Sequence, residues 1–334
     1  MDNCILQVDD LGVCFHTEEG RIQAVDGVSF ALHEGETLGI VGESGSGKSV
    51  TSLALMGLVP SPPGEICAGR ALYRGENLLT MPPRRFSEIR GNRIAMIFQD
   101  PMTSLNPYMT IADQLIEVTV VHLGHSHREA LKHAIEMLER VGIPSPSRRI
   151  FAYPHEFSGG MRQRVMIAMA LSCQPDILIA DEPTTALDVT IEAQILELMK
   201  QLQQSQGTAI IMITHDMGVV ANICHRVHVM YAGKIVEQAG CDALFANPRH
   251  PYTLGLLKSV PRLTQATSAR LATIDGQPPD LAHLPIGCAF EPRCGYATPE
   301  CRQQSPQLQD SEDADRFACF VDITKESPLK DPHA

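Results

Sequence analysis

The sequence has no long apolar run and no surplus of positive charge. None of its hydrophobic stretches approaches the roughly 20 residues that a membrane-spanning helix needs, so we expect no segment to cross a bilayer. The formal net charge is −12 at pH 7, whereas proteins that bind nucleic acid usually present a basic face. We therefore expect no nucleic-acid partner.

Residues 1–4 also lack the basic start and apolar core of a secretory signal. We therefore expect the chain to stay in a reducing compartment, where structural disulfides are rare. Its composition is that of an ordinary globular protein, because 44% of its 334 residues are hydrophobic and 20% are charged. That length suits one large domain and an appendage.

The octapeptide Gly42–Ser49, GESGSGKS, matches the phosphate-loop pattern G-x-x-x-x-G-K-[ST]. An apolar strand is expected before it over 37–41, and a helix after it over 49–58. The glycines let backbone N–H groups turn toward phosphate oxygens, and the helix N-terminus adds a positive dipole end. An ordinary turn would not need the Lys-Ser pair. We therefore expect the loop to hold ATP, with Lys48 on the β- and γ-phosphates and Ser49 on Mg²⁺; the contacting residues are Gly42, Ser44, Gly45, Gly47, Lys48 and Ser49.

An acidic pair, Asp181-Glu182, follows the continuous apolar run 177–180. Such a run is typical of a parallel strand that is buried on both faces. Its carboxyl end lies at the sheet edge where α/β proteins bind ligands. We expect Asp181 to contact Mg²⁺ directly or through one of its ligands, and Glu182 to orient and partly deprotonate the attacking water. Without the upstream loop, the pair would equally suit a solvated strand end.

Three other segments stand at the ends of expected elements. Gln99 leaves the apolar strand 94–97 for a proline-punctuated loop, and His215 closes the strand 208–214. The tripeptide Ser158-Gly159-Gly160 opens a helix expected over 162–171, and its exposed N–H groups would form a second anion site. Spacing alone does not assign a function to Gln99 or His215.

The order of the expected elements indicates an α/β fold. Residues up to about 98 favour strands, residues 109–172 favour helices, and strands alternate with helices from 177 to about 239. We therefore predict a P-loop nucleotide-binding domain over 1–250 with an inserted helical subdomain at about 100–172. A small cysteine-containing extension follows over 251–334, with a proline-rich tract at 275–285.

Four of the ten cysteines are bunched in that extension: Cys288, Cys294, Cys301 and Cys319. Their spacing, C-x₅-C-x₆-C-x₁₇-C, lacks the C-x₂-C pairs usual in zinc sites. Four thiolates with no nearby histidine favour a [4Fe–4S] cluster, while a Cys₄ zinc site and free thiols remain alternatives. A metal centre would explain how a small segment with little core folds.

Four blocks in this order resemble the ATP-hydrolysing subunit of an ABC transporter: Gly42–Ser49, Gln99, Ser158–Gly160 and Asp181-Glu182. The segments 99–107, 153–161 and 250–253 resemble the peptide-importer branch of that family, most closely the D-type ATPase of oligopeptide and dipeptide permeases. The resemblance covers nearly the whole chain. Phe157 and Met161 replace the leucine and glutamine that usually flank the Ser-Gly-Gly tripeptide.

This resemblance implies roles that spacing alone does not give. Gln99 would sense Mg²⁺ and the γ-phosphate, and His215 would contact the γ-phosphate. Phe15 would stack on adenine, and Asp188 would lie at the seam between two ATPase subunits. Ser158, Gly159 and Gly160 would serve the nucleotide held by the other subunit. The family also implies an iron–sulfur cluster in the cysteine tail.

The resemblance also implies partners and a location. These are a second, F-type ATPase subunit, two transmembrane permease subunits and an extracytoplasmic peptide-binding protein, with the chain at the cytoplasmic face of the inner membrane. Peptides are the expected cargo, and nickel or glutathione are alternatives within the same branch. A non-transport ABC ATPase acting on nucleic acid or ribosomes, and a redox or iron-sensing regulator, stay open as other classes.

Overall fold

The computed structural model describes residues 3–18, 20–184, 187–259, 274–310 and 315–325. The chain forms two compact units, each assembled from three segments. The first unit comprises Met1–Ile5, Leu32–Thr37 and Thr80–Met212, and the second comprises Leu6–Ala31, Leu38–Leu79 and Ile213–Ala334. Among the described residues, no helix combines the length and apolar character required to span a membrane.

Three buried strands, adjacent in the order β8-β7-β6, run through the first unit, and β8 continues two residues beyond it. Strands β6 and β7 pair in parallel from Ile94 opposite Ile177 to Ile97 opposite Ala180. Every residue of the three strands is buried, which explains their unbroken apolar sequences. Their bounds are β6 (Ile94–Ile97), β7 (Ile177–Asp181) and β8 (Ala209–Thr214).

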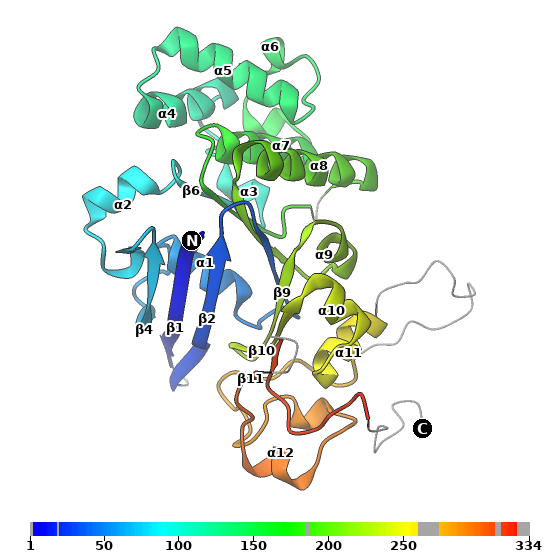
Figure 1. The fold of residues 1–334 in the computed structure, drawn as a ribbon. Helices are drawn as coiled ribbons and strands as arrows, with labels where there is room; N and C mark the ends of the chain where they lie inside the picture. The colour runs from blue at the N-terminus through cyan, green and yellow to red at the C-terminus, as the bar shows by residue number, and fades with distance from the viewer. Residues whose placement is uncertain (1–2, 19, 185–186, 260–273, 311–314, 326–334) are drawn as a thin grey trace. The chain divides into compact units, whose positions relative to one another are not determined.

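Most of the first unit's remaining chain is helical, as the sequence predicts (Figure 1). Capping boxes begin α4 and α5, since Thr110 pairs with Asp113 and Ser126 with Glu129. Helices α4, α5 and α7 pack against one another. The helices are α2 (Pro83–Ile89), α3 (Pro101–Ser104), α4 (Ile111–Leu123), α5 (His127–Arg140), α6 (Pro146–Arg149), η2 (Pro154–Glu156), α7 (Gly159–Leu171) and α8 (Val189–Gln206).

The second unit contains an antiparallel sheet with the strand order β2-β1-β4-β5. Strands β1 and β4 run antiparallel, with Leu6 opposite Tyr73 and Phe15 opposite Gly64. The strands are β1 (Cys4–Thr17), β2 (Gly20–His33), β4 (Gly64–Tyr73) and β5 (Glu76–Asn77).

A second group of strands in this unit has the order β11-β12-β10-β9-β3. Strand β3 lies parallel to β9, and the other pairs are antiparallel. The strands are β3 (Thr37–Val41), β9 (Arg226–Tyr231), β10 (Lys234–Gly240), β11 (Gln309–Asp310) and β12 (Arg316–Phe317). The helices of this unit are α1 (Lys48–Leu55), η1 (Leu78–Thr80), α9 (Met217–Ile223), α10 (Cys241–Ala246), α11 (Pro251–Lys258), η3 (Glu291–Arg293) and α12 (Pro299–Gln303).

An aromatic cluster joins the C-terminal extension to this second group of strands. The Tyr231 ring centroid lies 4.6 Å from that of Tyr252 and 5.2 Å from that of Phe290. Tyr252 and Phe290 are themselves 5.4 Å apart, and all three residues are buried. Helix α11 and the chain around Phe290 therefore share one core with β9.

Candidate nucleotide and cysteine sites

The segment Gly42–Ser49 forms the connection between β3 and α1, as predicted. Gly47, at the N-cap of α1, has φ 100° and makes no side-chain capping bond. A Cβ at Gly47 would lie 2.5 Å from the carbonyl oxygen of Ala24, so only glycine fits. Helix α1 ends at Leu55, three residues before the predicted end, because Gly57 turns the chain with φ 61°.

Lys48 is buried beneath this loop, with 6% of its surface exposed. Its Nζ donates to the carbonyl oxygens of Gly42 and Glu43, both at 2.8 Å, and to Ser46 Oγ at 3.3 Å. Ser44 and Gly45 are exposed, and Ser49 is half-buried. The ammonium group is therefore held inside the loop that the sequence predicts will wrap phosphate.

Gln99 and Glu182, both predicted site residues, meet in the first unit. The Gln99 Nε2 donates to Glu182 Oε2 at 3.0 Å. Glu182 follows β7 directly and has φ 48°, a left-handed conformation that costs energy in a non-glycine residue. Asp181, the last residue of β7, is buried with 4% exposure. Strand β7 thus delivers both acids to one sheet edge, and Gln99 reaches the second of them.

The tripeptide Ser158-Gly159-Gly160 begins α7. Ser158 is its N-cap, and its Oγ accepts from the Met161 N–H at 3.4 Å. Ser158 and Gly159 are exposed, and no acidic residue lies in the first turn. The positive end of the helix dipole therefore faces outward without a neutralising carboxylate in that turn.

The other predicted nucleotide residues are His215, Asp188 and Phe15. His215 follows β8 and is exposed. Asp188 caps α8, accepting from the N–H groups of Thr190 and Ile191 at 3.1 Å each. Thr185 and Ala186, which precede it in the chain, lie outside the described residues. Phe15 is half-buried on β1, and a Cβ at Gly64 would approach its ring to 3.0 Å.

The four cysteines of the extension line one small, largely apolar cavity. Burial raises the pKa of the Cys294 thiol to about 12, and the proximity of Cys319, Cys288 and Cys301 adds to the shift. Burial also raises the pKa of Cys319 to about 11. Backbone N–H groups point at two of the sulfur atoms, Tyr296 N at Cys294 and Val321 N at Cys319, both at 3.4 Å. At neutral pH and without a cation, raised pKa values keep Cys294 and Cys319 as neutral thiols.

The spacing of these sulfur atoms matters for the choice of metal. A tetrahedral zinc site with Zn–S bonds of about 2.3 Å places its sulfurs about 3.8 Å apart. Within the described ranges, no three of the four sulfurs lie within 4.8 Å of one another. The spacing of these four sulfurs is therefore wider than a single zinc ion requires.

A different trio, Cys14, His16 and Glu65, does converge within 4.8 Å. His16 Nε2 lies 3.1 Å from Glu65 Oε2, and both side chains are more than half exposed. The Arg21 guanidinium bonds to Cys14 and Cys67, and these contacts raise its pKa. A positive charge so close disfavours a bound cation, so we assign no metal to this trio.

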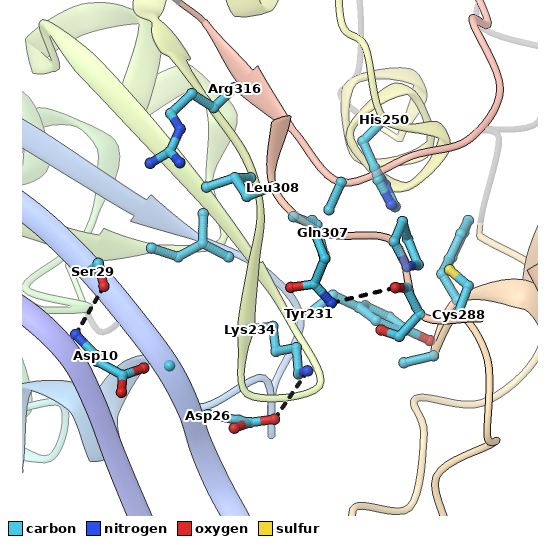
Figure 2. A pocket seen from close by; sticks show the side chains of 18 residues that line it. Asp10, Asp26, Ser29, Tyr231, Lys234, His250, Cys288, Gln307, Leu308 and Arg316 are labelled. Carbon is cyan, nitrogen blue, oxygen red and sulfur yellow. Dashed lines mark hydrogen bonds and ion pairs between the residues drawn. The ribbon is translucent and has the colours of Figure 1, made fainter. Parts of the chain in front are cut away.

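A cavity of about 430 Å³ lies beside the extension (Figure 2). On its wall Lys234 pairs with Asp26 at 3.0 Å, and the Asp10 N–H donates to Ser29 Oγ at 2.8 Å. Arg316, also on its wall, pairs with Asp310 at 2.8 Å. Because these groups already bond to protein, the cavity gives no indication of a ligand.

Sequence patterns did not reveal one contact to the phosphate loop. The Glu43 carboxylate bonds to Arg293, 250 positions along the chain. No local pattern relates the two residues. The sequence drew attention to Arg293 only indirectly, because this residue directly precedes Cys294, one of the four bunched cysteines.

Two family models match the chain. "ABC transporter" covers residues 25–185, and "Oligopeptide/dipeptide transporter, C-terminal region" covers residues 236–301. The oligopeptide transport ATP-binding protein OppD of Bacillus subtilis (strain 168) is 55% identical over 304 residues, which cover 91% of this chain and 85% of the relative. The chain belongs to the OppD family of ABC transporter ATP-binding proteins. The predicted family and the α/β ABC-type fold are both confirmed.

Another OppD-family relative and two solved structures agree with this assignment. The OppD protein of Salmonella typhimurium is 52% identical and covers 96% of this chain and 95% of its own length. An ATP-binding cassette solved as a dimer in a post-hydrolysis state with ADP and Pi matches with a TM-score of 0.65 and 26% identity, over 71% of this chain and 98% of that one. The cbiO1 protein of Clostridium perfringens, part of the cbiONQ transporter complex, matches with a TM-score of 0.59 and 28% identity, over 73% and 91%.

Proposed function

We propose that the chain is the ATP-hydrolysing subunit of an importer for oligopeptides or dipeptides. The observation that carries this proposal is the union, in one chain, of an ABC cassette and a peptide-transporter C-terminal region. The proposed location is the cytoplasmic face of the inner membrane, because OppD relatives are transport proteins by name. The proposed division is a nucleotide domain over 1–250 and an extension over 251–334.

The phosphate loop would bind the nucleotide. When the β- and γ-phosphates arrive, their oxygens would replace the Gly42 and Glu43 carbonyls as acceptors for Lys48. The buried ammonium group of Lys48 is therefore hydrogen-bonded both with and without nucleotide. Neither state carries the free-energy cost of an unpaired buried charge. Phe15 would stack on adenine at the other end of the nucleotide.

The hydroxyl of Ser49, the carboxylate of Asp181 and the amide oxygen of Gln99 would hold Mg²⁺, since this cation prefers oxygen ligands. Mg²⁺ would neutralise charge on the phosphate oxygens. Glu182 would orient water and accept its proton, and the Gln99 contact would fix the Glu182 carboxylate. His215 would donate to the γ-phosphate.

A complete hydrolysis site would need a second ATPase subunit. The outward-facing start of α7 at Ser158-Gly159-Gly160 suits phosphate on that partner's nucleotide. Asp188 would lie at the same seam. The proposed partner is an F-type subunit, so that two ATP molecules are enclosed between two chains.

Permease subunits would dock on the helical part of the first unit. This part of the chain carries exposed apolar side chains, including Tyr108 at 90% exposure, Met102 at 61% and Phe151 at 58%. Phe151 lines a surface hollow of about 580 Å³ together with Arg148 and Arg149. Apolar groups beside a hollow are typical of a surface that contacts another protein. Because Met102 is only three residues after Gln99, a shift of Gln99 on ATP binding would move Met102 and so reach the permease.

Cys288, Cys294, Cys301 and Cys319 would hold a [4Fe–4S] cluster, with zinc as the alternative. The four cysteines would supply the four thiolate ligands that such a cluster takes, and the wide spacing of their sulfurs supports this choice over a single zinc ion. The cluster would supply a rigid cross-link to a segment that has little core of its own.

The decisive experiment is reconstitution of the four-subunit complex in vesicles with its binding protein. We expect ATP hydrolysis that rises when the binding protein carries peptide, together with uptake of labelled peptide. Uptake of nickel or glutathione instead would assign one of the alternative cargoes. Co-purification with ribosomes or RNA, and no uptake of any of these, would contradict a transport role.

A further inference from the structure

One residue, Glu43, joins the phosphate loop to the C-terminal extension. Its carboxylate accepts from Arg293 Nη1 at 2.6 Å and from Nη2 at 3.0 Å. Its backbone N–H donates to the Tyr252 hydroxyl at 2.6 Å. Its carbonyl accepts from Lys48 Nζ at 2.8 Å. All the polar groups of Glu43 are therefore engaged, and one of them holds the lysine that would bind phosphate.

Arg293 is fixed in place by the extension. Its side chain is 6% exposed, and its Nε donates to the Asp275 carbonyl at 2.8 Å. The guanidinium carbon lies 6.0 Å from the Tyr231 ring centroid and 5.9 Å from that of Phe290. A planar guanidinium matches both oxygens of a carboxylate, so this two-pronged contact fixes orientation as well as distance.

We infer that Arg293 is a positioning residue for ATP binding, acting through Glu43 on Lys48 and the first turn of the phosphate loop. The inference rests on the proposed role of that loop in holding ATP. A glycine-rich loop has many accessible conformations, and ordering it on binding costs free energy. The extension removes part of that cost in advance by fixing Glu43. Nucleotide affinity is thus set in part from outside the nucleotide-binding domain.

The first test compares Arg293→Met with Arg302→Met in the full-length chain, purified without oxygen. The two arginines share two features, since each adjoins a cysteine of the cavity and each pairs with a glutamate. Arg302 Nε lies 3.0 Å from Glu291 Oε1, and its side chain is exposed where that of Arg293 is buried. Binding of a fluorescent ATP analogue is measured directly, along with metal content. We expect R293M to weaken binding by roughly 5- to 20-fold and R302M to leave it unchanged.

The second test asks whether Arg293 acts through Glu43. In a double-mutant cycle, E43Q and the E43Q/R293M pair should each bind ATP about as weakly as R293M. The KM for ATP should rise in parallel while kcat of the assembled complex changes by less than about 2-fold. R293K should recover only part of the affinity, because lysine lacks the two-pronged geometry.

Three outcomes would overturn the inference. In the first, R293M binds the ATP analogue as tightly as the wild type. In the second, R293M and R302M lose the same amount of affinity. In the third, the loss of affinity in the double mutant equals the product of the losses in E43Q and R293M. If R293M does not fold, the ATP affinity of E43Q alone tests the inference, because Glu43 lies on the loop. Normal ATP affinity in E43Q would exclude the mechanism. A wild-type chain that does not bind the analogue would instead contradict the proposed function of the loop.

Discussion

The side-chain amide of Gln99 donates to the carboxylate of Glu182 at 3.0 Å, linking the ends of two adjacent parallel strands. Glu182 holds this place in a left-handed conformation that an ordinary surface glutamate would not adopt. Strain concentrated at a polar contact is typical of functional sites.

We expect Glu182→Gln to retain ATP binding but slow hydrolysis in the assembled complex by about 10²–10⁴-fold. Glutamine keeps the shape and can still bond to Gln99, but it does not accept the proton. Steady-state hydrolysis and nucleotide retention are the measurements, and Glu197→Gln on the exposed face of α8 is the control. Near-normal turnover would rule out the general-base role.

Lys48→Ala should weaken nucleotide binding by roughly 100-fold, because a charge-assisted contact to two phosphates is lost. The Gly42 and Glu43 carbonyls would also lose their donor. Equilibrium binding of a labelled nucleotide tests this, with thermal unfolding as a check on the fold. Unchanged affinity would contradict the assignment of the loop.

The sequence predicted those parts of the site whose functional residues lie close together in the chain. The loop Gly42–Ser49 needs its glycines, lysine and serine within eight positions, and β7 needs only an apolar run before Asp181. The paired two-residue strands β11 and β12 carry no readable pattern, since alternation requires a longer segment. The contact between Glu43 and Arg293 depends on how distant segments pack, and no spacing rule describes that.

A charge on the proposed docking surface should disrupt the complex. Phe151→Asp places a carboxylate where a 58% exposed aromatic side chain would be covered by a permease. We expect about 10-fold less co-purification with the membrane subunits, because burying an unpaired charge is costly. The control is Ile286→Asp, at a 91% exposed position on the extension. Equal assembly of both variants would place the permease contact elsewhere.

Tyr252→Phe should lower the free energy of unfolding by about 1–3 kcal/mol, because it leaves the Glu43 N–H without its acceptor. Tyr252 is fully buried, so water does not simply replace the hydroxyl. Tyr108→Phe is the matched control, since the Tyr108 side chain is 90% exposed. Urea unfolding of the full chain measures both, and equal stability of the two variants would show that the hydroxyl contributes little.

Metal analysis of chain purified without oxygen should find about four iron and four sulfide per molecule, both lost in Cys294→Ser. Cys224→Ser is the matched control, because burial also raises the pKa of the Cys224 thiol but that residue does not line the cavity. Since burial raises the pKa of Cys294 to about 12, an unmetallated chain should carry a protonated thiol there and react slowly with iodoacetamide at neutral pH. If the analysis finds one zinc per chain instead, the four cysteines hold a structural zinc ion and not an iron–sulfur cluster. A chain with no bound metal and four slowly reacting thiols would show that packing alone holds the extension together.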